Sequence, residues 1–317
     1  MTERAREPDR VDEIASERII LPAAELPQLL GGLVAAALAD AGRAAEVIAH
    51  GGAWIDSARA TTADQLVPPG AVISIRLPPG GVYPQVMLTA AQIIFEDDDL
   101  LAINKPAGTY VDAVPWDTQG NLRQALTSFL RERNGTAPTL HLVHRLDRDT
   151  TGVLLFSKNP AVNAPLQRAF INAAVTKHYL ALCSGEPADD HFVLDTGHGR
   201  SRRGVFRVYE REEVGTTLVD GSRVQQMRTH FRVLRRFGDA TLIEALPITG
   251  RTHQIRLHLA AAGLPLIGDP KYGGPQTWRG AHYPRHLLHA HRLILPHPHN
   301  NAPFEILAVP PAWAERG

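Results

Sequence analysis

The hydrophobic pattern of the first part of the chain predicts a small α/β domain. Apolar residues in segments 27–41 and 44–49 are typical of two helices, and Gly51 would end the second. Short apolar runs at residues 53–56 and 72–75 then predict strands. The predicted organisation is therefore a disordered leader over residues 1–18, a small domain over residues 19–77 and a linker, rich in proline and glycine, over residues 78–92.

From residue 93 to residue 317 the pattern predicts a larger second domain with many strands. Apolar runs on both sides of Asp97-Asp98-Asp99 predict a β-hairpin, and a second hairpin is predicted across Phe237-Gly238-Asp239. In the first strand of that second hairpin, arginines alternate with apolar residues, which predicts one basic face and one buried face. Helical patterns are predicted over residues 122–133, 159–174 and 252–262, with Asn159 and Thr252 as N-caps of the last two. Residues 186–224 predict a long hairpin with mobile tips.

The most informative stretch is His144-Arg145-Leu146-Asp147-Arg148-Asp149-Thr150-Thr151-Gly152, which leads into the apolar run Val153–Phe156. The run predicts a buried strand, so the polar loop before it would sit on a rigid support. Asp147 has Arg145 and Arg148 close by in sequence, and positive neighbours favour the ionised carboxylate. An ionised Asp can act as a nucleophile or a general base. On spacing alone, a solvated turn remains the alternative.

Composition narrows the classes of partner. The 317 residues are 44% hydrophobic and 21% charged, as in an ordinary globular protein. Residues 1–100 carry 7 Lys/Arg against 15 Asp/Glu, whereas residues 141–300 carry 21 against 13, so a polyanion would be drawn to the second region. Solubility charge on exposed strands is the alternative explanation. Much of the basic excess comes from Arg200, Arg202, Arg203, Arg207, Arg211, Arg223, Arg228, Arg232, Arg235 and Arg236.

Other classes find little support in the sequence. The single cysteine, Cys183, excludes an internal disulfide framework and fits a reducing cytoplasm, where we expect the protein. The charged start of the chain is not a signal peptide, and no apolar run is long enough for a membrane span. The 15 histidines invite a metal site, but no Cys or HExxH motif accompanies them, so we expect none. The histidines that suggest it are His289, His291, His297 and His299.

The nine residues around Asp147 closely resemble the HRLDxxTSG signature of the RluA-type pseudouridine synthases, with Thr151 where that family usually has Ser. Further elements of the family occur along the chain, before and after this signature, in the family's order. They are Lys105-Pro106-Ala107-Gly108 (KPxG), Lys177-His178-Tyr179 (K-x-Y), Gly250-Arg251-Thr252-His253-Gln254-Ile255-Arg256, the loop Pro265–Gly273 and the short strand Leu288-His289-Ala290.

The resemblance implies an α+β fold, with a large mixed, mainly antiparallel sheet flanked by helices and loops in the catalytic domain, residues 93–317. Residues 19–77 are similar to the alpha-L RNA-binding domain that often precedes it. That small domain normally carries basic helices, whereas here Arg43 is nearly alone among acids. A strong grip on RNA by this domain is therefore not expected.

The resemblance also implies an activity, the isomerisation of uridine to pseudouridine in ribosomal RNA or tRNA without metal or organic cofactor. Asp147 would be the catalytic residue, Arg256 would pair with it, and Tyr179 would stack on the base and could help to remove its C5 proton. The target uridine must leave its stack, and Arg145 could fill the gap. The candidate RNA-binding residues are Lys105, Arg145, Arg148, Arg251 and His253.

Three alternatives to a ribosomal RNA enzyme stay open. One is a tRNA enzyme of the same family, and another is an RNA-binding or ribosome-assembly protein that no longer catalyses. The third, a glycosidase-like hydrolase, needs a second carboxylate, for which Asp149 is the only neighbour in sequence. We expect a monomer.

Overall fold

The computed structural model describes residues 3–6, 17–21, 27–201 and 205–315. The chain divides into two compact units. Unit 1 comprises Met1–Met87 with Tyr110–Ser128, and unit 2 comprises Leu88–Thr109 with Phe129–Gly317. The predicted domains assigned residues 110–128 to the second domain, so this assignment is corrected.

Unit 1 contains the two predicted helices, α1 (Leu30–Leu38) and α2 (Ala41–His50). The side chain of Asp40 accepts the backbone N–H of Arg43 at the start of α2, and Gly51 ends α2 at φ +79°. The helices share an apolar core with a sheet whose strands run in the order β1 (Glu3–Arg6), β2 (Glu17–Leu21), β7 (Ile73–Leu77), β4 (Ala53–Ile55) and β5 (Ala58–Arg59). A separate short ladder pairs β3 (Gln28–Leu29) with β6 (Leu66–Val67).

The start of the chain differs from the prediction of a disordered leader over residues 1–18. Strand β1 pairs antiparallel with β2, from Glu3 opposite Ile20 to Arg6 opposite Glu17. Pairing supplies the backbone hydrogen bonds that an edge strand otherwise lacks. Residues 1–2 and 7–16 of the predicted leader lie outside the described residues.

Segment Tyr110–Ser128 belongs to unit 1 because its backbone and carboxylate groups bond to α2 and to the short strands of that unit. Asp117 Oδ1 lies 2.9 Å from His50 Nδ1, and Trp54 Nε1 donates to the carbonyl of Pro115 at 2.9 Å. Arg59 Nη2 donates to the carbonyl of Val114 at 3.0 Å. Sequence pattern alone could not reveal these bonds, because their partners are more than fifty residues apart.

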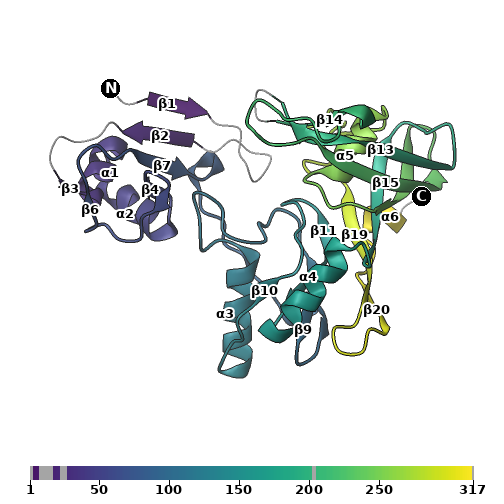
Figure 1. The fold of residues 1–317 in the computed structure, drawn as a ribbon, viewed down its shortest axis with the longest axis horizontal. Helices are drawn as coiled ribbons and strands as arrows, with labels where there is room; N and C mark the ends of the chain where they lie inside the picture. Colours follow the sequence, from purple (N-terminus) through teal and green to yellow (C-terminus); the bar gives the residue numbers. More distant parts are fainter. Residues whose placement is uncertain (1–2, 7–16, 22–26, 202–204, 316–317) are drawn as a thin grey trace. The chain divides into compact units, whose positions relative to one another are not determined.

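Unit 2 is built on one large sheet, as expected (Figure 1). Within the described residues β11 and β19 pair in parallel, whereas the other strand pairs of this sheet are antiparallel. The order along the sheet is β14 (Phe206–Tyr209), β13 (His191–Arg200), β15 (Gln225–Arg236), β16 (Ala240–Pro247), β12 (Thr176–Ser184), β19 (Leu288–Pro296), β11 (Thr151–Ser157), β9 (Leu100–Lys105) and β8 (Ile93–Glu96). β10 (His141–Leu142) pairs with β11, and β20 (Pro303–Leu307) with β19; β17 (Thr277–Trp278) and β18 (Ala281–His282) form a separate hairpin.

Both predicted hairpins are confirmed, β8–β9 and β15–β16. Along β15 the buried residues Met227, Thr229 and Phe231 alternate with exposed Arg228 and Arg232, as the pattern predicted. The predicted hairpin over residues 186–224 corresponds to β13 and β14. Its tip at residues 202–204, which carries Arg202 and Arg203 and was predicted to be mobile, lies outside the described residues.

Four α-helices occur in the described chain from residue 122 onward: α3 (Leu122–Asn134), of which the part up to Ser128 belongs to unit 1, α4 (Asn163–Ile171), α5 (Gln254–Ala261) and α6 (Ala312–Glu315). The start predicted at Asn159 is confirmed, because its side chain accepts the N–H of Ala161 in a 3₁₀ turn over Pro160–Val162. The predicted cap of α5 is wrong. His253, not Thr252, occupies the N-cap position, in the left-handed conformation and without a side-chain cap bond. Described helices include none long and apolar enough to cross a membrane.

Candidate active site

The loop His144–Gly152, which leads into β11, is fixed by a hydrogen bond to His144 and by close backbone packing at Gly152. The N–H of Leu155 donates to His144 Nε2 at 3.1 Å, and burial, with the charge of Lys177, lowers the pKa of His144 to about 3. His144 is therefore a neutral acceptor near pH 7. Gly152 has φ +106°, and a Cβ at this position would lie 2.1 Å from the carbonyl oxygen of Ala290. Only glycine fits where β11 meets β19.

Lys105 supports the same loop from beneath. Its side chain is fully buried, and Nζ donates to the carbonyls of Pro106 at 3.0 Å, Arg148 at 2.6 Å and Thr150 at 3.0 Å. The prediction that Lys105 binds RNA is therefore wrong, because a buried ammonium cannot reach a phosphate. Instead it binds the carbonyl oxygens of Arg148 and Thr150, which lie one and three residues after Asp147.

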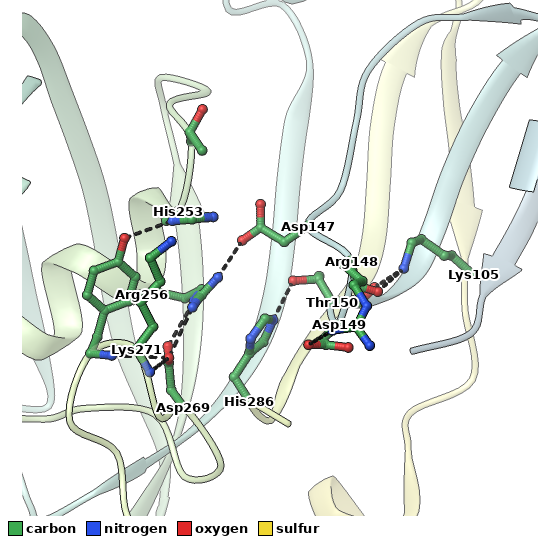
Figure 2. A network of polar contacts seen from close by, with 12 residues as sticks. Lys105, Asp147, Arg148, Asp149, Thr150, His253, Arg256, Asp269, Lys271 and His286 are labelled. Atoms are coloured by element: carbon green, nitrogen blue, oxygen red, sulfur yellow. Dashed lines mark hydrogen bonds and ion pairs between the residues drawn. The ribbon is translucent and has the colours of Figure 1, made fainter. Parts of the chain in front are cut away.

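Asp147 and Arg256 meet, as the family resemblance implied, although 109 residues separate them. Arg256 Nη1 lies 3.3 Å from Asp147 Oδ2, and the Arg256 side chain is fully buried while that of Asp147 is 18% exposed. The same guanidinium binds Asp269 through Nε to Oδ2 at 2.8 Å and Nη2 to Oδ1 at 3.0 Å. Figure 2 shows Arg256 between the two carboxylates. A buried cation thus holds one carboxylate that can reach solvent and one that cannot.

Two tyrosines border this pair. Tyr179 lies on β12, and burial, together with the charge of Asp147, raises the pKa of its hydroxyl. Burial likewise raises the pKa of Tyr272, whose ring lies 4.9 Å from Arg256 Cζ. The Tyr272 hydroxyl is 2.7 Å from His253 Nδ1. Both phenols are neutral near pH 7, so neither is a ready proton acceptor.

Asp147, Tyr179, His253 and Arg256 line a cavity of about 620 Å³, a size typical of small-ligand sites. Of the predicted site residues it brings together Asp147, Tyr179 and Arg256 with Arg145, Arg251 and His253. Arg145 is exposed, whereas His253 is 4% exposed. The cavity is also lined by two exposed apolar residues, Ile171 and Ile248. The cavity therefore combines a carboxylate, cations and apolar surface.

Two predicted RNA-binding residues do not line the cavity. Lys105 is buried below the loop, as described above, and Arg148 is partly buried beside Asp149, Nη1 to Oδ2 3.6 Å. Asp149 is 4% exposed and also faces Arg285 at 3.4 Å. Buried and paired, Asp149 does not present the second carboxylate that a glycosidase-like hydrolase needs.

The sequence reasoning missed two residues of the site. Asp269 lies in the loop Pro265–Gly273, which was matched to an element of the family without a role for Asp269. His286 was not singled out; its Nε2 is 2.9 Å from Thr150 Oγ1, and burial lowers its pKa to about 4. The available signal for Asp269 was its place in a short Gly-Asp-Pro turn.

Comparison with known proteins places this fold and this cavity in context. A family model described as RNA pseudouridylate synthase matches residues 99–261, about half of the chain. RNA pseudouridine synthase 1 of Oryza sativa is 37% identical over 264 residues, covering 71% of this chain and 74% of that protein. This chain belongs to the RluA-type RNA pseudouridine synthases. It is thus an isomerase that acts on RNA.

Two further comparisons agree with the family. Ribosomal large subunit pseudouridine synthase D of Nitrosomonas europaea is 39% identical over 214 residues, covering 66% of this chain and 59% of that protein. The solved structure of human RNA pseudouridylate synthase domain containing 4 aligns with a TM-score of 0.56 and 26% identity, covering 70% of this chain and 90% of that chain. The α+β fold predicted from the resemblance is confirmed.

Proposed function

We propose that this synthase converts specific uridines of large-subunit ribosomal RNA to pseudouridine, with Asp147 as its catalytic residue. One observation carries the proposal: the Asp147 carboxylate lies at a cavity large enough for a nucleoside and is held there by a fully buried arginine. The relative in Nitrosomonas europaea, named for the large ribosomal subunit, favours ribosomal RNA over tRNA.

The reaction conserves all atoms of the uridine. The glycosidic N1–C1′ bond breaks, the uracil turns within the cavity, a C5–C1′ bond forms, and the C5 proton is transferred to solvent while N1 gains one. Asp147 would either attack the sugar or base or take a sugar proton, and each role needs the ionised form. Arg256 binds Oδ2 of Asp147 and leaves Oδ1 for the substrate.

Tyr179 is proposed to stack on the uracil. Its neutral phenol makes it a poor acceptor for the C5 proton, so assistance with that step, which the family resemblance suggested, receives no support from its surroundings. Arg145 is exposed at the cavity and is proposed to stack in the gap left by the extruded base. The exposed Arg228 and Arg232 of β15 would contact phosphates without reading sequence.

The proposal is tested with purified protein and two substrates, a protein-free large-subunit ribosomal RNA transcript and an unmodified tRNA pool. Pseudouridines are located by chemical mapping and counted by mass spectrometry. The proposal expects new pseudouridine in ribosomal RNA at one or a few uridines. Modification confined to tRNA would contradict the ribosomal assignment.

The alternative of a silent RNA-binding protein is separated by the variant Asp147→Ala. We expect it to form no pseudouridine while its RNA affinity stays within about threefold of the wild type, because most of the affinity comes from phosphate contacts, which a carboxylate does not make. The matched control is Asp239→Asn, the same loss of a carboxylate charge at a residue outside the cavity, where the amide oxygen can still accept Trp278 Nε1–H. Full turnover by Asp147→Ala would refute the catalytic assignment.

A further inference from the structure

The proposed reaction uses one of the two carboxylates that bind Arg256. The other, Asp269, is fully buried and does not line the cavity, so it touches no substrate. Its contacts to the guanidinium are nevertheless the closer ones. They measure 2.8 and 3.0 Å, against 3.3 Å for the single contact from Asp147. A buried charge that is bound this closely, yet is remote from the substrate, calls for a role.

The geometry of the Arg256–Asp269 pair is bidentate. Nε and Nη2 each donate to a different oxygen of the same carboxylate. Such a pair fixes the plane of the guanidinium, because both groups are planar and two parallel bonds forbid rotation. Once the plane is fixed, the remaining nitrogen, Nη1, can point in only one direction, which is toward Asp147 Oδ2 (Figure 2).

Asp269 is itself immobilised by its own loop. Its Oδ1 accepts the backbone N–H groups of Lys271 at 3.2 Å and Tyr272 at 3.3 Å. The loop is tied to β12 where the N–H of Ile267 donates to the carbonyl of Leu182 at 2.9 Å. At Gly268, φ is +78° and a Cβ would lie 2.1 Å from the Arg285 carbonyl, so the turn before Asp269 admits no side chain. The carboxylate is therefore a fixed anchor on a loop that is tied to β12.

The face of the guanidinium is held as well as its edge. The Tyr272 ring lies 4.9 Å from Arg256 Cζ, and the hydrogen bond between the Tyr272 hydroxyl and His253 holds that ring. Although burial acts to raise it, the bonds and charge of Arg256 hold the pKa of the Asp269 carboxyl below its ordinary value. The site thus places one cation between two anions.

We propose that Asp269 is a positioning residue for the isomerisation, acting through Arg256 to fix the direction and divide the charge of the guanidinium that holds Asp147. This inference rests on the proposed catalytic role of Asp147. Two consequences follow. A guanidinium nitrogen of fixed direction, Nη1, orients Asp147. Because Arg256 also neutralises Asp269, it neutralises Asp147 less than an arginine paired with Asp147 alone would.

The first test compares steady-state kinetics of the wild type and Asp269→Asn on the RNA that the wild type modifies. The amide keeps the shape but cannot accept both donors. We expect kcat to fall by about 10²-fold, since small misplacements of reacting groups cost on this order. KM for RNA should stay within about threefold, because Asp269 touches no substrate. Asp239→Asn is again the matched control. Unchanged kcat in a folded Asp269→Asn protein would overturn the proposal.

A double-mutant cycle asks whether Asp269 acts through Arg256. Arg256→Lys removes the guanidinium fork while keeping the charge. If Asp269 works only by holding that fork, the double variant Asp269→Asn/Arg256→Lys loses no more kcat than the worse single variant. Losses that multiply would show two independent contributions and would overturn the proposal.

A third measurement needs no change at Asp269 and therefore survives a folding failure of that variant. The ¹⁵Nε–Hε resonance of Arg256, assigned by its loss in Arg256→Lys, is followed in Asp147→Asn. Because Nε donates to Asp269, the resonance should keep its shift and slow exchange. Its disappearance would mean that Asp147 holds Arg256, which contradicts the proposed order. This spectrum does not depend on turnover. If the wild type formed no pseudouridine, the proposed function would fail, while the spectrum would still test whether Asp269 holds Arg256.

Discussion

The burial of Lys105 leads to a prediction that separates a structural lysine from an RNA-binding one. Lys105→Met keeps most of the side-chain volume and removes the three donors of the ammonium. The carbonyls of Pro106, Arg148 and Thr150 then lose the partner that draws them together. Since Arg148 follows Asp147 directly, the loop that presents the carboxylate should loosen.

The size of the effect follows from what each carbonyl keeps. A buried acceptor left without a hydrogen bond lowers the free energy of unfolding by about 1–3 kcal/mol. The Pro106 carbonyl still accepts the hydroxyl of Thr109, at 3.0 Å, and the Arg148 carbonyl still accepts the N–H of Gly108, at 3.0 Å. The loss should therefore lie near the lower end for two of the three carbonyls, which gives about 3–5 kcal/mol in all. For a domain of this size that is a fall in Tm of about 6–20 °C.

The assay is urea and thermal denaturation followed by circular dichroism, paired with RNA binding at two or more salt concentrations. We expect lower stability and reduced turnover with an unchanged salt slope. An exposed phosphate-binding lysine would give the opposite set, unchanged stability and a salt slope reduced by about one. That result would refute the structural role assigned here to Lys105.

Three further predictions follow from the same contacts. Gly152→Ala should destabilise unit 2 by about 3 kcal/mol or more, because the new Cβ would meet the neighbouring strand. The control Gly135→Ala, at φ +78° with nothing within 4 Å of the new Cβ, should cost about 1 kcal/mol. Equal losses of stability in urea titrations would contradict this prediction. His144 and His286 have pKa values lowered to about 3 and about 4, so their contribution to stability is complete above about pH 6.5 and is lost as the pH falls toward those values. The loss is up to about 1.4 kcal/mol per histidine per pH unit. A free energy of unfolding that does not change between about pH 7 and about pH 5 would refute this prediction. Because the pKa of Tyr179 is raised, the pH–rate profile should show no limb from its ionisation up to about pH 9; such a limb, absent in Tyr179→Phe, would contradict a neutral phenol.

Local sequence signals predicted the elements that depend on neighbours in the chain. Gly51 ends α2, Asn159 begins the turn before α4, and the hairpins close across the predicted polar turns. The glycine and the asparagine act through conformational or hydrogen-bonding preferences that are strong wherever these residues occur. The pairing of Asp147 with Arg256 was expected only from the family resemblance.

Features that depend on distant groups were not predictable in this way. Lys105 resembles an exposed lysine in a turn, and only carbonyls from residues 43 and 45 positions later make its burial possible. Asp269 resembles a turn residue until α5 brings a guanidinium beside it. The cap expected at Thr252 failed because the chain places His253 in a left-handed conformation, where its ring meets Tyr272. In each case tertiary contacts overrode a local preference.

The account stands on the carboxylate of Asp147, and the isosteric variant Asp147→Asn tests it most directly. Pseudouridine formed per enzyme is counted by mass spectrometry under single-turnover conditions, with RNA binding measured in parallel. We predict wild-type RNA affinity and no detectable pseudouridine. Turnover at the wild-type rate by this variant would contradict the account.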